Sequence, residues 1–203
     1  MFRVKMRGKF IVVEGIDGNG KTTQAKLIAR YFGKKGKKIF MTREPSRSKY
    51  GRRISYFLLH PPKRGITTEE WLELFTLDRL EHVKNEILPA VRKGKVVICS
   101  RYFYSTLAYQ LKEKEWKNYA KRFLKPNLAF VFDVPANIAI SRIKERMMKK
   151  GKKFSYFEKK KLLERLRKNY KKEAKHLKEI RIIDSRPSPD KIFEKVKKEL
   201  EKL

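Results

Sequence analysis

The chain has 203 residues and a formal charge of +32, and its content of 40% hydrophobic and 37% charged residues predicts one folded domain, residues 1–203, with a sizeable core. No apolar run is long enough to cross a bilayer, and no long apolar segment follows the basic residues 1–9, so we expect neither a membrane span nor a secretory signal. The only cysteine, Cys99, excludes an internal disulfide, which favours a reducing, cytoplasmic setting.

Short apolar runs alternate along the chain with longer amphipathic segments, and this alternation predicts an α/β fold with a parallel sheet. In chain order, the predicted strands are Phe10–Glu14, Lys38–Met41, Val96–Ser100, Leu128–Asp133 and Arg181–Asp184. The predicted helices are Lys21–Phe32, Trp71–Leu88, Ala136–Met148, Tyr156–His176 and Asp190–Leu203.

Several residues indicate where these helices end and which face they bury. Gly33 and Gly36 are expected to end the first helix, and Ser188 or Asp190 to cap the last one. The predicted apolar face of the long helix consists of Leu72, Leu74, Phe75, Leu77, Leu80, Val83 and Ile87.

The segment between the first strand and the first helix fits the phosphate-loop pattern G-x-x-x-x-G-K-[ST]. Glycines let successive backbone N–H groups turn toward phosphate oxygens, and the helix start adds partial positive charge. Lys21 would reach the outer phosphates, and the Thr22 hydroxyl would bind Mg²⁺. The predicted ATP-phosphate site therefore comprises Gly15, Ile16, Asp17, Gly18, Asn19, Gly20, Lys21, Thr22 and Thr23.

Four segments occur in this order along the chain: GIDG at 15–18, TREP at 42–45, LFTLDR at 74–79 and SRYFYSTLAYQ at 100–110. Together they resemble thymidylate kinases, from Phe10 to the closing helix. The resemblance implies a P-loop kinase fold, a five-stranded parallel sheet flanked by helices on both faces, in a homodimer. It also implies that the chain transfers the γ-phosphoryl group of ATP to dTMP, giving dTDP for dTTP synthesis, with ATP and Mg²⁺ as cofactors.

The resemblance also assigns an acceptor site. It places Arg101 on the dTMP phosphate, together with a second arginine for which Arg43 and Arg47 are the candidates. It places Asp17 near the sugar and phosphate. It places Phe75 on the thymine ring and Arg79 at the thymine edge; these two residues are four apart and share a helix face. Ser105 or Thr106 would lie near the base and Tyr109 near the sugar, where it disfavours a 2′-hydroxyl.

The catalytic groups should be basic, because the reaction brings two anions together. No general base is required, since the acceptor phosphate is mostly a dianion at neutral pH. The loop residues Gly18 and Asn19 supply no cation, so the resemblance moves this role to a lid near residues 142–157. The predicted catalytic residues are Lys21, Arg101, Arg142 and Arg146.

One residue departs from the family pattern, which has Asp-Arg-Tyr or Asp-Arg-His after the third strand. This chain has Ser100 in place of the aspartate. The missing carboxylate normally lies beside the metal and its waters, so we expect weaker use of Mg²⁺ or slower turnover. Glu44 or Asp133 are the candidates to compensate.

The charge of +32 leaves other functions open. The lysines are spread over many predicted helices without one dense stripe and interleaved aromatics, so we expect only nonspecific binding to nucleic acid at low salt. One alternative function is a kinase for another nucleoside monophosphate or a deoxynucleoside. The other is a nucleotide-dependent nucleic-acid-binding protein.

Overall fold

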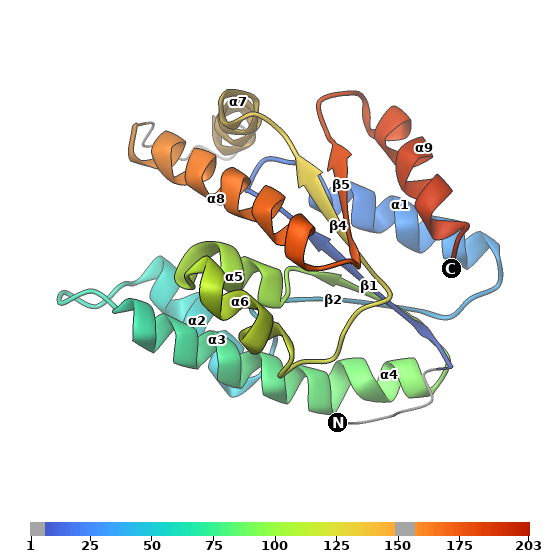
Figure 1. Ribbon diagram of the computed structural model, residues 1–203, viewed down its shortest axis with the longest axis horizontal. Helices are drawn as coiled ribbons and strands as arrows, with labels where there is room; N and C mark the ends of the chain where they lie inside the picture. The colour runs from blue at the N-terminus through green and yellow to red at the C-terminus, as the bar shows by residue number, and fades with distance from the viewer. Residues whose placement is uncertain (1–6, 149–156) are drawn as a thin grey trace.

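A sheet of five parallel strands forms the centre of the computed structural model, which describes residues 7–148 and 157–203 (Figure 1). Its order is β2-β3-β1-β4-β5, and its strands are β1 (Lys9–Glu14), β2 (Ile39–Arg43), β3 (Val96–Ser100), β4 (Leu128–Asp133) and β5 (Ile180–Asp184). The bounds of β3 and β4 agree with the prediction residue for residue. Because all strands run parallel, their carboxyl ends share one edge of the sheet, where α/β proteins bind ligands.

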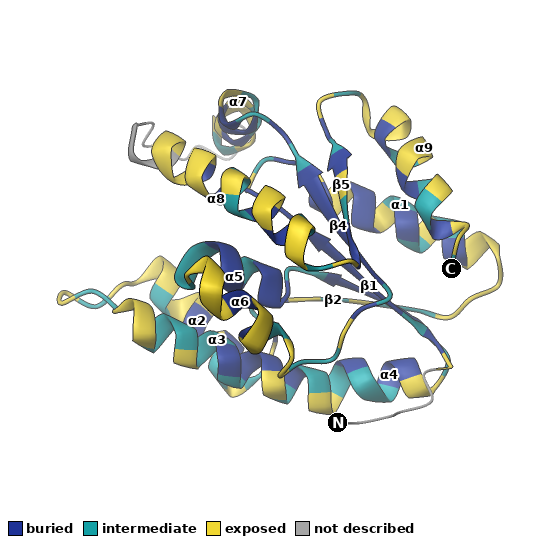
Figure 2. Cartoon of the chain, viewed as in Figure 1, coloured by how far each residue is buried: buried dark blue, intermediate teal, exposed yellow. Residues whose placement is uncertain are grey.

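Helices cover both faces of this sheet, which confirms the predicted fold class. Alternate residues of β1 point to opposite faces: Ile11 and Val13 pack with α1 (Lys21–Lys34) and α9 (Pro189–Leu200). Phe10 and Val12 pack in the second core with the helices α4 (Leu88–Arg92), α5 (Phe103–Gln110), α6 (Glu113–Ala120), α7 (Ala136–Met148) and α8 (Phe157–His176). Figure 2 shows the result, with the buried central strands β1, β3 and β4 between helices whose outer faces are exposed.

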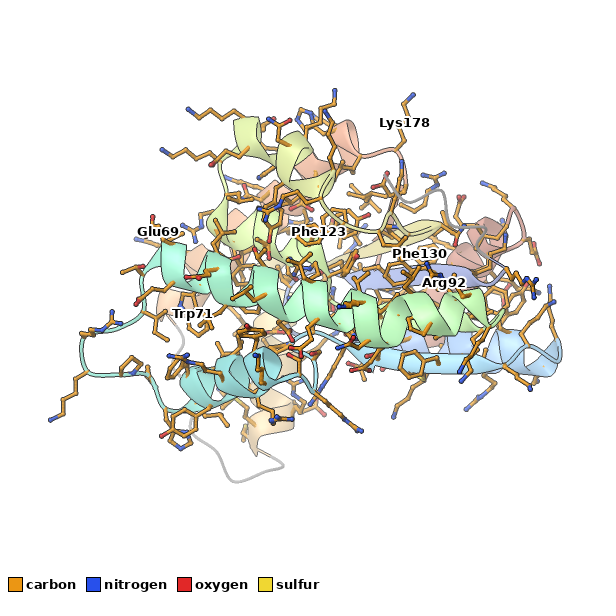
Figure 3. The ribbon with its side chains drawn as sticks, turned by 90° about the horizontal axis from the view of Figure 1, so that it is seen from below. Glu69, Trp71, Arg92, Phe123, Phe130 and Lys178 are labelled. Atoms are coloured by element: carbon orange, nitrogen blue, oxygen red, sulfur yellow. The ribbon has the colours of Figure 1, made fainter. Side chains whose placement is uncertain are left out.

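The long helix predicted at Trp71–Leu88 is longer than expected, and the apolar face predicted for it is only partly buried. It runs through α3 (Thr68–His82), a π-helical turn η1 (Val83–Ile87) and α4, from Glu69 to Arg92 in Figure 3. The expected apolar face is wrong in part, because Leu80 is 44% exposed. The buried side chains of α3 are polar: Thr76, Asp78, Arg79 and His82. The last three contact Ser46, Glu44 and Thr42 respectively, at and beyond the end of β2, and Thr76 bonds to the Tyr119 hydroxyl.

Two features explain the extent of this helix. A capping box fixes its start, because Thr67 Oγ1 accepts the N–H of Glu70 and the Glu70 carboxylate accepts the N–H of Thr67. Pro89 does not end the helix. In a regular helix a proline ring clashes with the carbonyl four residues earlier, but here a wider π turn precedes Pro89 and shifts that hydrogen-bond spacing.

Three helices were not expected from the sequence: α2 (Lys49–Leu59), α5 and α6. Five of the eight residues of α5 are buried, so this helix has no polar face to reveal its period. Gly33 lies inside α1, which ends at Lys34, and Gly36 with φ 71° forms the turn that follows. Ser188 occupies the cap position of α9 without a side-chain bond.

None of the helices in the described residues is long and apolar enough to span a membrane. The lid expected near residues 142–157 includes residues 149–156, which lie outside the described part of the chain.

Candidate active site

The phosphate loop joins the carboxyl end of β1 to the start of α1, as predicted. Gly15, Gly18 and Gly20 have φ values of 119°, 82° and 87°, a region that residues with a side chain rarely adopt. Thr22 and Thr23 are exposed in the first turn of α1, and that turn contains no acidic residue. The positive end of the helix dipole is therefore open to an anion.

Two contacts brace the loop from beneath. The buried Asn19 side chain donates to the carbonyls of Glu14 and Phe132, at 3.0 and 2.9 Å, and accepts the N–H of Lys21. Gly18 packs so closely on α7 that an added Cβ would lie 2.3 Å from the Ala139 carbonyl oxygen. The side chain of Asn19 thus supports the loop, and only its backbone is available to phosphates.

Lys21 lies folded over this loop. Its Nζ donates to the Ile16 carbonyl at 3.2 Å and to Asp17 Oδ1 at 3.3 Å. Burial and the nearby Arg101 guanidinium lower the pKa of Lys21 to about 8. An anionic ligand at the loop would favour the protonated form.

Arg101, at the carboxyl end of β3, meets Lys21 through a shared carboxylate. Its Nη2 donates to Asp17 Oδ1 at 2.7 Å, and its guanidinium lies 6.0 Å from the centre of the Tyr109 ring. Burial alone would raise the pKa of Asp17, but Arg101 and Lys21 outweigh it and lower the pKa to about 2. Arg101 has φ 69°, a strained conformation for a residue with a side chain.

Glu14, which the sequence analysis did not select, holds the backbone that carries Arg101. Its fully buried carboxylate accepts the N–H groups of Tyr102 and Ser105, at 2.7 and 3.2 Å. It also accepts hydroxyl bonds from Ser105 and Tyr170, at 2.9 and 3.1 Å. This carboxylate therefore stabilises the turn in which Arg101 adopts its unusual φ. An acidic residue that closes a buried strand was the signal in the sequence.

The residues predicted around the base lie in two environments. Phe75 is half-buried, with its ring centre 5.7 Å from that of Trp71. Arg79 is 1% exposed, and its Nε and Nη2 donate to Glu44 Oε2 at 2.9 and 2.6 Å. Its Nη1 donates to the Tyr119 hydroxyl at 3.1 Å. The structure thus shows Arg79 within a buried ion pair.

The remaining predicted acceptor residues differ in accessibility. Arg43 and Arg47 are exposed, beside and beyond the end of β2. Tyr109 is half-buried beside Arg101. Ser105 Oγ donates to Glu14 and accepts from Arg101 Nη1 at 3.1 Å, and Thr106 is buried.

Arg142 and Arg146 lie on α7, which packs against the phosphate loop where Gly18 meets Ala139 and Ile143. Arg142 donates to the carbonyls of Ser185 and Arg186 after β5, at 3.0 and 3.3 Å. Arg146 is exposed one turn further on. The guanidinium of Arg142 is therefore held by two backbone carbonyls.

Two more basic groups lie near the loop and were not selected from the sequence. Arg167 and Lys171 of α8 form ion pairs with Asp133 at the end of β4, at 2.5 and 3.0 Å. A small cavity beside them is lined by Gly15, Ile16, Val131, Phe132, Asp133, Val134, Arg167 and Tyr170.

Both carboxylates proposed to compensate for Ser100 already form ion pairs. Glu44 binds Arg79, and Asp133 binds Arg167 and Lys171. Within residues 7–148 and 157–203, no three His, Cys, Asp or Glu side chains gather as a metal site. The described residues therefore offer no carboxylate cage for Mg²⁺, and the exposed Thr22 hydroxyl is an oxygen donor at the start of α1.

Comparison with known proteins agrees with this geometry. A family model described as "Thymidylate kinase" matches residues 13–196. A protein named "Probable thymidylate kinase" from Pyrococcus abyssi is 41% identical over 198 residues, which cover 94% of this chain and 95% of that protein. The "Thymidylate kinase" of Carboxydothermus hydrogenoformans is 36% identical over 211 residues, covering 98% of this chain and 99% of that protein.

Proposed function

This chain belongs to the thymidylate kinase family and catalyses the ATP-dependent phosphorylation of dTMP to dTDP, and we propose that Lys21, Asp17 and Arg101 form the centre of that reaction. One observation carries the proposal: Lys21 Nζ and Arg101 Nη2 contact the same oxygen of Asp17, at 3.3 and 2.7 Å. A cation of the donor site and a cation of the acceptor site are therefore neighbours. Phosphoryl transfer needs this proximity, because both substrates are anions.

The donor ATP would bind with its phosphates on the backbone N–H groups of residues 15–23. Lys21 would leave the Ile16 carbonyl and Asp17 to contact the outer phosphates. Mg²⁺ fits here with Thr22 as its protein ligand, and when bound it neutralises phosphate charge. Arg146, an exposed cation of α7, would approach the transferring group, and Arg142 would follow once its bonds to two carbonyls break.

The acceptor dTMP would place its phosphate at Arg101, with Arg47 and Arg43 on its other side. Its phosphate is mostly a dianion at neutral pH, so no residue needs to remove a proton. Phe75 would contact the thymine ring and Tyr109 the sugar. Arg79 would act at the base edge through the groups it already holds, Glu44 and Tyr119.

Matched variants test this assignment in a coupled assay of ADP release. Lys21→Met and Arg101→Met should each lower kcat/KM for dTMP about a hundredfold or more, the range for loss of a group that stabilises developing charge. Lys26→Met and Arg30→Met, on exposed positions of α1, remove the same charges and should have little effect. Wild-type kcat/KM in either of the first two variants would refute the assignment.

We also propose the assembly and setting of the protein. Exposed apolar side chains on α2, namely Tyr56, Leu58 and Leu59, support a homodimer, which analytical ultracentrifugation can test. Cys99 is a buried free thiol, which supports a cytoplasmic setting. The net charge of +32 supports weak, salt-sensitive binding to nucleic acid. We propose that the chain forms one domain, which carries the kinase site.

A further inference from the structure

The segment between β2 and α2 has an unusual anchor. It reads Ser46-Arg47-Ser48. Asp78 of α3, which is 0% exposed, accepts the N–H of Ser46 at 2.9 Å and the hydroxyls of Ser46 and Ser48 at 2.5 and 2.7 Å. A single buried carboxylate therefore binds the residues on both sides of Arg47.

Further contacts fix the same backbone. Ser46 Oγ accepts the N–H of Ser48 at 3.0 Å, and the Arg47 carbonyl accepts Arg52 Nη1 at 2.8 Å. Ser48 Oγ accepts the N–H of Gly51 at 2.9 Å and so caps α2. An added Cβ on Gly51 would lie 2.2 Å from the Ser46 carbonyl oxygen and 2.7 Å from Asp78 Oδ1, so the three elements are in close contact.

The side chain of Arg47 itself is exposed, in contrast to its flanking residues. Binding a phosphate with a long side chain costs conformational entropy, and a fixed backbone reduces that cost. Because Ser46 and Ser48 share one carboxylate partner, their hydrogen bonds order the backbone on both sides of Arg47.

We propose that Asp78 is a positioning residue of the acceptor site, which fixes Arg47 through Ser46 and Ser48 so that its guanidinium meets the phosphate of dTMP. This inference rests on the proposed contact between Arg47 and that phosphate. Asp78 contacts no substrate; it acts through the loop.

Thymidine provides the test, because it has the base and sugar of dTMP but no phosphate. The ratio of thymidine Kd to dTMP Kd, measured by calorimetry, reports the phosphate contacts alone. Arg47→Ala and Asp78→Asn should each lower this ratio roughly tenfold or more, and the double variant should lower it no further than Arg47→Ala does. Glu73→Gln, at an exposed position of the same helix, is the control and should keep the wild-type ratio.

Three results separate the possibilities. If Arg47→Ala lowers the ratio but Asp78→Asn does not, or if their effects multiply in the double variant, the positioning role of Asp78 is refuted. If Arg47→Ala keeps the wild-type ratio, the proposed contact of Arg47 fails, and the inference fails with it. If Asp78→Asn does not fold, Ser46→Ala and Ser48→Ala replace it, and the same ratio must fall in both.

Discussion

The titration of Lys21 gives a sharp prediction for nucleotide binding. Its pKa in the free protein is lowered to about 8 by burial and by Arg101, so the side chain loses its proton as the pH rises through this value. Nucleotide phosphates favour the charged form, so binding above that pH must take up a proton. If the bound form stays protonated, the Kd for ADP should rise roughly eightfold between about pH 7.5 and about pH 9.

Isothermal titration calorimetry measures both quantities. Binding at about pH 9 in two buffers of different ionisation enthalpy should show uptake of close to one proton. Lys21→Arg keeps its charge at both pH values and should show a flat Kd. In Arg101→Met the loss of a neighbouring cation should move the rise in Kd to higher pH. A Kd for the wild-type protein that stays constant to about pH 9, with no proton uptake, would refute the reasoning.

Three further predictions concern stability and the metal. Within the described residues, neither carboxylate oxygen of the buried Glu173 has a hydrogen-bond partner, and burial and Glu14 raise its pKa well above its usual value. The free energy of unfolding should therefore fall as the pH rises from about 4.5 through that raised pKa. Glu173→Met should lack this fall, and urea unfolding at about pH 8 should show it about 1–3 kcal/mol more stable than the wild type. An equal pH dependence of stability in both proteins would contradict this. Gly18→Ala places a Cβ against Ala139 at φ 82° and should cost at least about 2 kcal/mol more than Gly65→Ala, which has φ 75° and open space; equal thermal stability of the two variants would contradict it. Ser100→Asp should lower the Mg²⁺ concentration at half-maximal rate or raise kcat, and no change in either would refute the expectation that Ser100 weakens the use of Mg²⁺.

The sequence predicted the sheet and the phosphate loop well because their signals are local. Runs of β-branched and aromatic residues mark β3 and β4 to the residue, and glycines with a lysine mark the loop. The helix α5 was missed because it is short and none of its residues is exposed, so it lacks an amphipathic period.

The groups that support the site could not be predicted in the same way. Glu14 binds Tyr102, 88 positions away, and Asp78 binds Ser46, 32 positions away, so their partners become neighbours only in the fold. Arg79 was expected at the base edge, a role that stays a prediction; that its guanidinium binds Glu44, directly after β2, and Tyr119 of α6 was not expected. A hydrophobic pattern cannot reveal these contacts, because it records burial and not the partner of a buried charge.

The central claim is that this site transfers phosphate from ATP to dTMP. The most direct measurement is the rate of ADP release from Mg·ATP with dTMP, dUMP, dCMP, dGMP, AMP, UMP and thymidine supplied separately. The account predicts the highest kcat/KM for dTMP, with dTDP as the product and little turnover of UMP or thymidine. Faster turnover of another acceptor, or no turnover of dTMP by protein that binds ATP, would contradict it.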